Sequence, residues 1–332
     1  MKLLVIGGTK FLGRYVVETA RARGDEVTTF NRGKTNPTLF PDVEHLTGDR
    51  DGGLEVLAHR SWDAVIDTCG YAPRVVDQSA RLLAGQVGIY AFVSSVSVYA
   101  DFKQRGITED QPLASLDPAF TEETAPANYG AQKARCEQSV RAHFPANALI
   151  VRPGIIVGPH DPTDRFTYWV HRIGTESRVV VPASDRSAFQ FIYARDLADW
   201  ILSMVADGRQ GTFNATGPEE PLSMKSFFEL CRDSLNPNAE LRWASESILA
   251  EHGLPDWNQM PLWVPGSEPD MIGFFTVNCK RAAAAGLAFT STQDVVSRTF
   301  EWIRAQPVPY PWKLGMPRNK EADLAVALRP KP

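Results

Sequence analysis

The sequence has no long apolar run and no excess of positive charge. Apolar residues near the N-terminus extend only from Leu3 to Ile6 before glycines interrupt them, and no later segment reaches about 18 uninterrupted apolar residues. We therefore expect a cytoplasmic protein that binds no membrane. The formal net charge is −4, so the composition also predicts no nucleic-acid partner, because proteins that bind nucleic acid usually carry a basic surface.

Cysteine and histidine are both scarce. The 332 residues include 4 cysteines and 6 histidines. The cysteines lack the paired spacing of a zinc knuckle or a disulfide framework, and we interpret them as reduced thiols. Since His143, His160 and His171 also lack metal-ligand spacing, the sequence predicts no metal site.

Short apolar runs alternate with helical patterns through the first half of the chain. The runs lie at residues 3–7, 26–30, 43–48, 63–68, 89–95 and 148–153. Such alternation implies parallel strands with helices on both faces. Strands that are apolar nearly throughout fit a sheet buried on both sides. The sequence therefore predicts an α/β fold with a doubly wound parallel sheet.

The stretch IGGTKFLG follows the first of these runs. Gly7 and Gly13 bracket a predicted turn from strand to helix. In that position the start of the helix offers unpaired N–H groups and the positive end of its dipole to a pyrophosphate. We interpret the stretch as a nucleotide-binding loop; the alternative is a tight turn with only a structural role.

This opening resembles the extended branch of the short-chain dehydrogenase/reductase superfamily, the NAD-dependent epimerase/dehydratase family. Members carry GxxGxxG where this chain has GGTKFLG, so Lys10 replaces the middle glycine. The resemblance implies a Rossmann-type sheet and a homodimer. It also implies that a dinucleotide is held by Gly7, Thr9, Lys10, Phe11, Leu12, Gly13, Asn31, Arg32, Lys34, Asp49, Cys69 and Pro153.

The regular alternation ends near Pro159, which indicates a second domain. Strand-like runs and helical patterns continue at 178–182, 189–193, 196–205, 224–235 after the N-cap Ser223, 291–305 and 319–328. We expect a dinucleotide-binding domain (1–160 plus about 189–215) and a smaller mixed α/β substrate-binding domain (161–188 and 216–332). Segment 261–278 is interpreted as a cover over the substrate pocket.

The end of the second predicted strand bears on the choice of cofactor. An NAD-binding unit usually places Asp or Glu there to hold the ribose hydroxyls, but this chain has Asn31 followed by Arg32 and Lys34. Together with Lys10, these cations favour a 2′-phosphate, so the sequence predicts NADP(H) over NAD(H). The alternative is that Arg32 and Lys34 are solvated and Asn31 alone binds the hydroxyls.

The stretch YGAQK places Tyr129 and Lys133 on one face of a predicted helix. A nearby ammonium group stabilises a phenolate, so we expect Lys133 to lower the pKa of Tyr129. The run FVSSVSVYA resembles the serine strand of the family, which puts the active hydroxyl on Ser95 rather than on Ser94 or Ser97. The predicted catalytic set is Ser95, Tyr129 and Lys133; the alternative is a member that has lost catalysis.

The resemblance also bears on the substrate. Family members that act on nucleotide sugars hold the diphosphate with an Asn and an Arg, whose positions align with Ile155 and Phe189 here. Apolar groups cannot replace those donors, so we expect a substrate without the nucleotide. Substitute cations remain possible at Arg152, Arg165, Arg172 or Arg186. Candidate substrate contacts are Tyr71, Ser97, His160 and Phe189.

The expected activity is that of an NAD(P)-dependent carbonyl reductase or dehydrogenase acting on a small molecule. Dehydratase chemistry is disfavoured, because the family's Thr-Asp-Glu motif aligns with residues 95–97, which hold no acid pair. One alternative is a sugar or nucleotide-sugar epimerase that oxidises its substrate transiently. An alternative of another class is a non-catalytic protein that binds a dinucleotide or RNA, as do chloroplast relatives with a GGTRFIG-like opening.

Overall fold

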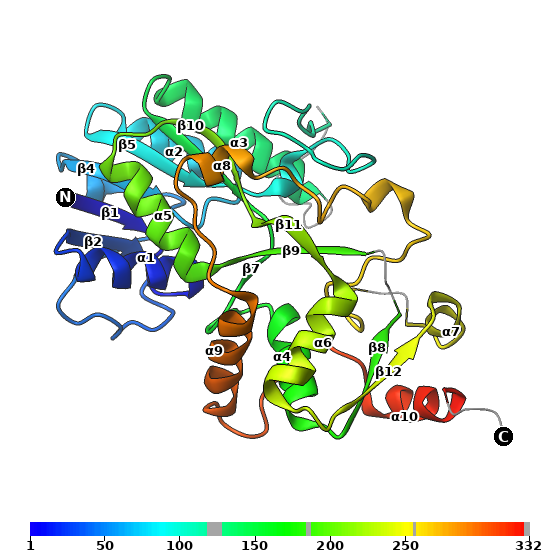
Figure 1. The fold of residues 1–332 in the computed structure, drawn as a ribbon. Coiled ribbons are helices and arrows are strands. Elements are labelled where there is room, and N and C mark those ends of the chain that lie inside the picture. Colours follow the sequence, from blue (N-terminus) through cyan, green and yellow to red (C-terminus); the bar gives the residue numbers. More distant parts are fainter. Residues whose placement is uncertain (118–127, 184–186, 255–256, 329–332) are drawn as a thin grey trace.

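The larger part of the molecule is built on one seven-stranded sheet (Figure 1). The structure is a computed structural model that describes residues 1–117, 128–183, 187–254 and 257–328. The strand order is β10-β6-β5-β4-β1-β2-β3, and every neighbouring pair is parallel. The strands are β1 (Lys2–Ile6), β2 (Glu26–Asn31), β3 (Glu44–Thr47), β4 (Trp62–Asp67), β5 (Val87–Val93), β6 (Ala148–Pro153) and β10 (Gly211–Ala215).

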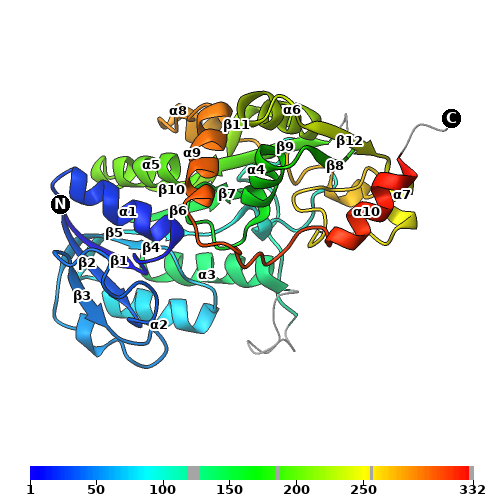
Figure 2. The same ribbon diagram turned by 90° about the horizontal axis from the view of Figure 1, so that it is seen from below.

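Helices cover both faces of this sheet, as Figure 2 shows. They are α1 (Phe11–Ala22), α2 (Pro73–Leu83), α3 (Tyr129–His143) and α5 (Ala194–Ala206). Helices α1 and α5 pack together on one face, and α2 and α3 on the other. Strand β1 is buried on both sides. Leu3 and Val5 pack in the core with residues of α1 and α5, while Leu4 and Ile6 pack in the core with residues of α2 and α3. The predicted doubly wound α/β fold is confirmed.

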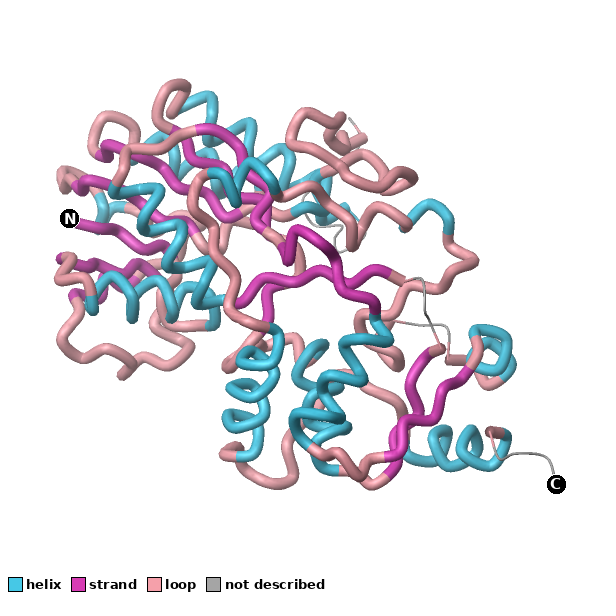
Figure 3. The backbone as a smooth tube through the Cα atoms, in the orientation of Figure 1, coloured by secondary structure: helices cyan, strands magenta, loops and turns pink. Residues whose placement is uncertain are grey.

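The second lobe, as we name the remainder of the fold, contains two small sheets (Figure 3). One has the order β11-β9-β7, and the other pairs β12 with β8. Their strands are β7 (Ile156–Val157), β8 (Arg178–Pro182), β9 (Ala188–Tyr193), β11 (Gly217–Ser223) and β12 (Glu240–Ala244). The helices are α4 (Arg165–Thr175), α6 (Met224–Leu235), α7 (Glu246–Glu251), α8 (Lys280–Ala284), α9 (Thr292–Arg304) and α10 (Arg318–Ala327). None of the helices in the described residues is long and apolar enough to cross a membrane.

An aromatic core holds the second lobe together. The ring centroids of Phe166 and Phe189 lie 5.1 and 4.9 Å from that of Phe227, and Trp169 lies 4.9 Å from Phe228. All five side chains are fully buried, and pairs at such spacings contribute beyond the area they bury. The core fixes β9 against α4 and α6, so the start of α4 is held rigidly.

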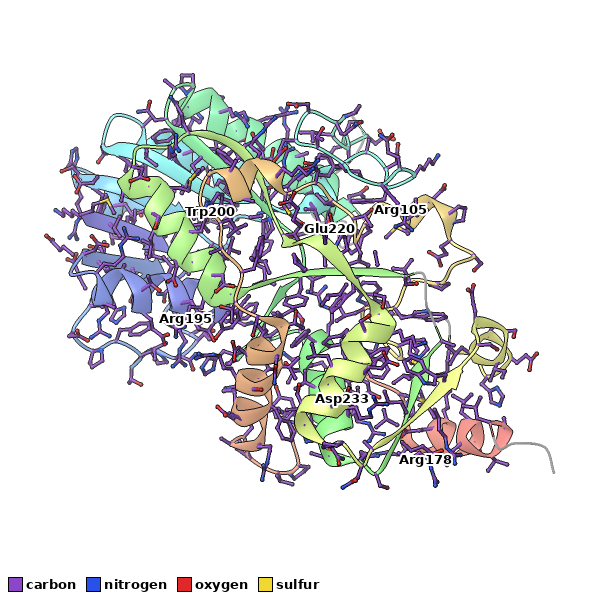
Figure 4. The ribbon with its side chains drawn as sticks, in the orientation of Figure 1. Arg105, Arg178, Arg195, Trp200, Glu220 and Asp233 are labelled. Carbon is purple, nitrogen blue, oxygen red and sulfur yellow. The ribbon has the colours of Figure 1, made fainter. Side chains whose placement is uncertain are left out.

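Segments late in the chain, around Gly273 and Ala285, contact the part of the molecule that is built on the seven-stranded sheet. Trp200, which projects from α5 in Figure 4, donates to the carbonyl oxygen of Ala285 at 3.1 Å. The amide of Gly273 donates to the carbonyl oxygen of Phe102 at 2.7 Å, and the ring of Phe102 meets that of Phe274 at 5.2 Å. Segment 261–278 therefore packs on the loop that follows β5.

Candidate active site

A cleft of about 580 Å³ opens at the carboxyl ends of the central strands. Ligands of open α/β sheets bind at the switch point where successive connections turn in opposite directions, and here that point lies between β1 and β4. The predicted cofactor residues that line the cleft are Gly7, Thr9, Lys10, Phe11, Leu12, Gly13, Asn31, Arg32, Lys34, Asp49 and Cys69. Pro153 ends β6 and is not among the lining residues.

The glycine loop fits tightly between β1, β4 and α1. A Cβ atom on Gly7 would lie 2.5 Å from Oγ1 of Thr68, and one on Gly13 would lie 2.7 Å from the Gly8 nitrogen. Gly7 also has a φ of +109°, which favours glycine. Lys10 has an ordinary extended conformation with φ −139°, so its position does not require a glycine. This explains why the loop accepts a lysine there.

Asn31 connects the glycine loop to the turn after β2. Its Nδ2 donates to the carbonyl oxygen of Gly7 at 3.0 Å, and its Oδ1 accepts from the Gly33 amide at 2.8 Å. Three exposed cations stand at the same end of the cleft without an ion pair to any described residue: Lys10, Arg32 and Lys34. These three cations outnumber Asp49, which lines the same cleft without an ion pair to a described residue, and no carboxylate stands in the place of Asn31.

A buried ion pair that the sequence analysis missed lies at the wall of the cleft, where Arg50 is a lining residue. Arg50, which follows β3, binds Asp67 at the end of β4 through Nη1–Oδ1 (2.8 Å) and Nη2–Oδ2 (2.5 Å). Ser79 and Tyr90 complete the network, and the Cys69 amide donates to Asp67 at 3.2 Å. Arg50 directly follows Asp49, the residue that the resemblance placed at the dinucleotide. The pair fixes the loop that follows β4.

Lys133 is buried at the inner wall of the cleft, with only 2% of its surface exposed. Its Nζ donates to the carbonyl oxygens of Gly70 (2.6 Å) and Val93 (2.7 Å), and it lies 4.2 Å from the ring centroid of Phe92. Burial lowers the pKa of Lys133 to about 8. One N–H of the ammonium group remains for a ligand in the cleft.

Tyr129 lines the cleft, and the Ser95 hydroxyl lies close to its phenol, although Ser95 is not itself among the lining residues. The Ser97 amide donates to the Ser95 oxygen at 3.1 Å, which leaves the Ser95 hydroxyl hydrogen for another acceptor. Burial raises the pKa of Tyr129, against the opposing effects of Ser95 and of the Arg165 guanidinium. We expected Lys133 to lower this pKa. In the structure its ammonium group binds carbonyl oxygens instead, and the cation that acts on the phenol is Arg165.

Three other candidates from the sequence are engaged with carboxylates of the protein. Ser94 donates to Glu137 at 2.6 Å, and Arg152 binds the same carboxylate at 2.9 and 2.7 Å. Arg172 forms ion pairs with Glu176 and Glu321. Arg152 and Arg172 are therefore unavailable to a substrate, whereas Ser94 lines the cleft with its hydroxyl hydrogen already donated to Glu137. Arg186 lies outside the described residues.

The structure does not bring every predicted substrate contact to the cleft. Phe189 is fully buried in the aromatic core, because β9 turns its ring away from the large sheet. His160 packs edge-on against Trp302 at 5.3 Å and is not a lining residue. Ser97 does not line the cleft either and acts through its backbone on Ser95. Tyr71 does line it, with 60% of its surface exposed.

The fold and this cleft define a protein of the Rossmann class. The chain belongs to the NAD dependent epimerase/dehydratase family, whose model matches residues 3–215. A curated relative, the chloroplast stem-loop binding protein of 41 kDa b from Arabidopsis thaliana, is 26% identical over 235 residues, which cover 65% of this chain and 58% of the relative. The chain therefore spans little more than half the length of that relative.

Solved structures of epimerases share the whole architecture. UDP-N-acetylglucosamine 4-epimerase from Bacillus cereus is 15% identical with a TM-score of 0.67, covering 94% of this chain and 99% of that one. UDP-glucuronic acid 4-epimerase from Bacillus cereus, in complex with UDP-glucuronic acid and NAD, is 15% identical with a TM-score of 0.65, covering 92% and 99%. At these identities the likeness shows a shared fold.

Proposed function

We propose that this chain is an NAD(P)-dependent oxidoreductase that interconverts a small carbonyl compound and its alcohol. The observation that carries the proposal is that Tyr129 and Lys133 line one cleft together with the glycine loop, with the Ser95 hydroxyl close to the Tyr129 phenol. A phenol in the cleft, with a hydroxyl and an ammonium group close by, forms an acid–base set. A nicotinamide bound in the cleft supplies or accepts the hydride.

In the reductive direction the carbonyl oxygen accepts hydrogen bonds from Ser95 and Tyr129. As the carbon gains the hydride, the oxygen takes the proton of the Tyr129 hydroxyl. The pKa of Tyr129 is raised by burial, which keeps the phenol protonated near neutral pH and ready to act as the acid. Lys133, with a pKa of about 8, is suited to return the proton, because it exists in both protonation states near that pH.

The charges at the adenosine end support NADP(H) as the preferred cofactor. Lys10, Arg32 and Lys34 lie at the cleft with no ion-pair partner in the described part of the chain. A 2′-phosphate would provide charge-assisted hydrogen bonds to such groups. Asn31, whose amide is already bound to Gly7 and Gly33, offers the ribose no carboxylate.

An epimerase that oxidises and reduces the same carbon is the second candidate. It is supported by the family and by the likeness to UDP-sugar 4-epimerases. Against a nucleotide-sugar substrate, Ile155 and Phe189 are buried apolar residues, so neither can bind a diphosphate. The stem-loop binding named for the chloroplast relative supports RNA binding as a third candidate, which the net charge of −4 disfavours.

The test is the consumption of NADPH with a panel of small ketones and free keto-sugars. We expect net oxidation of the cofactor, and we expect Tyr129→Phe to abolish it while the dissociation constant of NADPH changes less than about threefold. Unchanged turnover in Tyr129→Phe would refute the assignment. A changed epimer ratio without net oxidation of NADPH would establish the epimerase. Retarded electrophoretic mobility of a stem-loop RNA, without either activity, would establish the RNA-binding protein.

A further inference from the structure

Arg165 is the first residue of α4, and its guanidinium group is only partly engaged. Its Nε donates to Oγ1 of Thr163 at 3.1 Å, and Thr163 in turn donates to Asp161 at 2.7 Å. The two Nη groups have no hydrogen-bond or ion-pair partner among the described residues, although the side chain is half-buried. A half-buried guanidinium with four free N–H groups is unusual, and it indicates a ligand.

The guanidinium group lies near the reacting end of the cleft, although Arg165 is not itself among the lining residues. Arg165 and the Tyr129 hydroxyl interact electrostatically, and Pro162, three residues before Arg165, lines the cleft with Tyr129. In both Figure 1 and Figure 2, α3 begins at the boundary with the second lobe, to which α4 belongs. A ligand oxygen between Tyr129 and Arg165 therefore lies next to the reacting carbon.

The local charge sets a limit on the ligand. Asp161 also interacts electrostatically with Arg165, is 1% exposed, and has one oxygen without a hydrogen-bond partner. The pair carries a net charge between zero and +1, depending on whether Asp161 is protonated. A dianionic diphosphate would leave negative charge uncompensated there, which is costly at a half-buried site. A single carboxylate matches the charge and the planar fork of the guanidinium.

We propose that Arg165 binds a carboxylate of the substrate beside the Tyr129 hydroxyl. This rests on the proposed function and narrows it: the substrate is a keto acid or hydroxy acid rather than a neutral ketone or a nucleotide sugar. Arg165 provides an anion-binding group where the diphosphate-binding Asn and Arg of nucleotide-sugar enzymes are absent. It selects carboxylates instead of diphosphates.

The test is calorimetric binding to the protein saturated with NADP⁺ or NAD⁺, whichever binds more tightly. The probes are pyruvate, levulinate and 5-oxohexanoate, each paired with its methyl ester, and UDP-glucose. At least one keto acid should bind ten times more tightly than its ester. Arg165→Gln should remove that difference, and Arg165→Lys should keep part of it. The control Arg242→Gln removes a partly buried arginine in the middle of β12 and should change nothing.

The outcomes separate this inference from the proposed function. If no keto acid binds better than its ester, or if Arg165→Gln leaves the difference intact, the inference is overturned even where neutral ketones consume NADPH. Tighter binding of UDP-glucose than of every keto acid also overturns it. If carboxylates bind through Arg165 but no compound is turned over, the carboxylate-binding role of Arg165 is supported and the reductase assignment is contradicted.

Discussion

The ammonium group of Lys133 donates a 2.6 Å hydrogen bond to the carbonyl oxygen of Gly70. This bond joins α3 to the loop after β4, and the same loop is held from below by Asp67 through the Cys69 amide. Lys133 is thereby positioned by backbone carbonyl groups and not by the phenol of Tyr129. Its chemical state depends on burial, which can be tested without knowing the substrate.

Lys133 should make the stability of the protein depend on alkaline pH. Its pKa is about 8 in the folded state and 10.5 in an ordinary setting, so the unfolded chain binds the extra proton between these values. The free energy of unfolding should therefore rise with pH from about 8 to about 10.5, by up to roughly 3 kcal/mol relative to Lys133→Met. Urea unfolding of both proteins across that range measures the difference, and parallel curves would contradict a lowered pKa.

The ion pair between Arg50 and Asp67 should be expensive to break. Asp67 is fully buried, so Asp67→Asn leaves an uncompensated guanidinium and should lower the free energy of unfolding by about 3–5 kcal/mol. The matched control is Arg178→Gln, which removes an exposed pair with Glu240 at the far end of the second lobe (Figure 4) and should cost less than about 1 kcal/mol. Equal losses in the free energy of unfolding would show that the buried ion pair contributes no more to stability than the exposed one.

Cofactor preference should depend on Arg32. Removing a cation that binds the 2′-phosphate costs about 1.5–3 kcal/mol, so Arg32→Ala should raise the dissociation constant of NADP⁺ roughly tenfold or more. The constant for NAD⁺ should change less than about twofold, because the hydroxyl form lacks the phosphate. Arg209→Ala, at an exposed site after α5, is the control. If the wild-type protein binds NAD⁺ more tightly than NADP⁺, the predicted preference for NADP(H) is wrong, whatever Arg32→Ala does.

The sheet and its helices were predictable because their signals are local. Apolar runs marked β1 to β6, and Ser223 marked the start of α6, where its side chain accepts from the Ser226 amide. Each depends on periodicity or capping within a few residues. The glycine loop could also be predicted from a short stretch of sequence, because Gly7, Gly8 and Thr9 stand between a strand and a helix.

The chemistry around the site was less predictable because it depends on partners far apart in the chain. Nothing in the sequence pairs Arg152 with Glu137 or shows that no described residue forms an ion pair with Arg165. Phe189 shows the same limit for apolar residues. Its strand position was clear, but whether its ring faced the cleft or the aromatic core was decided by the packing of α4 and α6.

A last prediction concerns Gly130, the second residue of α3. A Cβ atom there would lie 1.9 Å from the carbonyl oxygen of Ser97, a backbone atom that cannot move alone. Gly130→Ala should therefore push the start of α3 away from the segment after β5 and separate Tyr129 from Ser95. A shift of about 1 Å at reacting groups costs on the order of a hundredfold in rate.

The expected result is a large loss of kcat with the cofactor still bound, because the glycine loop lies on other elements. Gly266→Ala is the matched control, since a Cβ there meets its nearest neighbour at an ordinary 3.5 Å. Circular dichroism and cofactor titration would establish that the Gly130→Ala protein is folded. If that folded protein kept full turnover, the close contact between Ser95 and Tyr129 would not be required for the reaction, and their assignment as partners would be wrong.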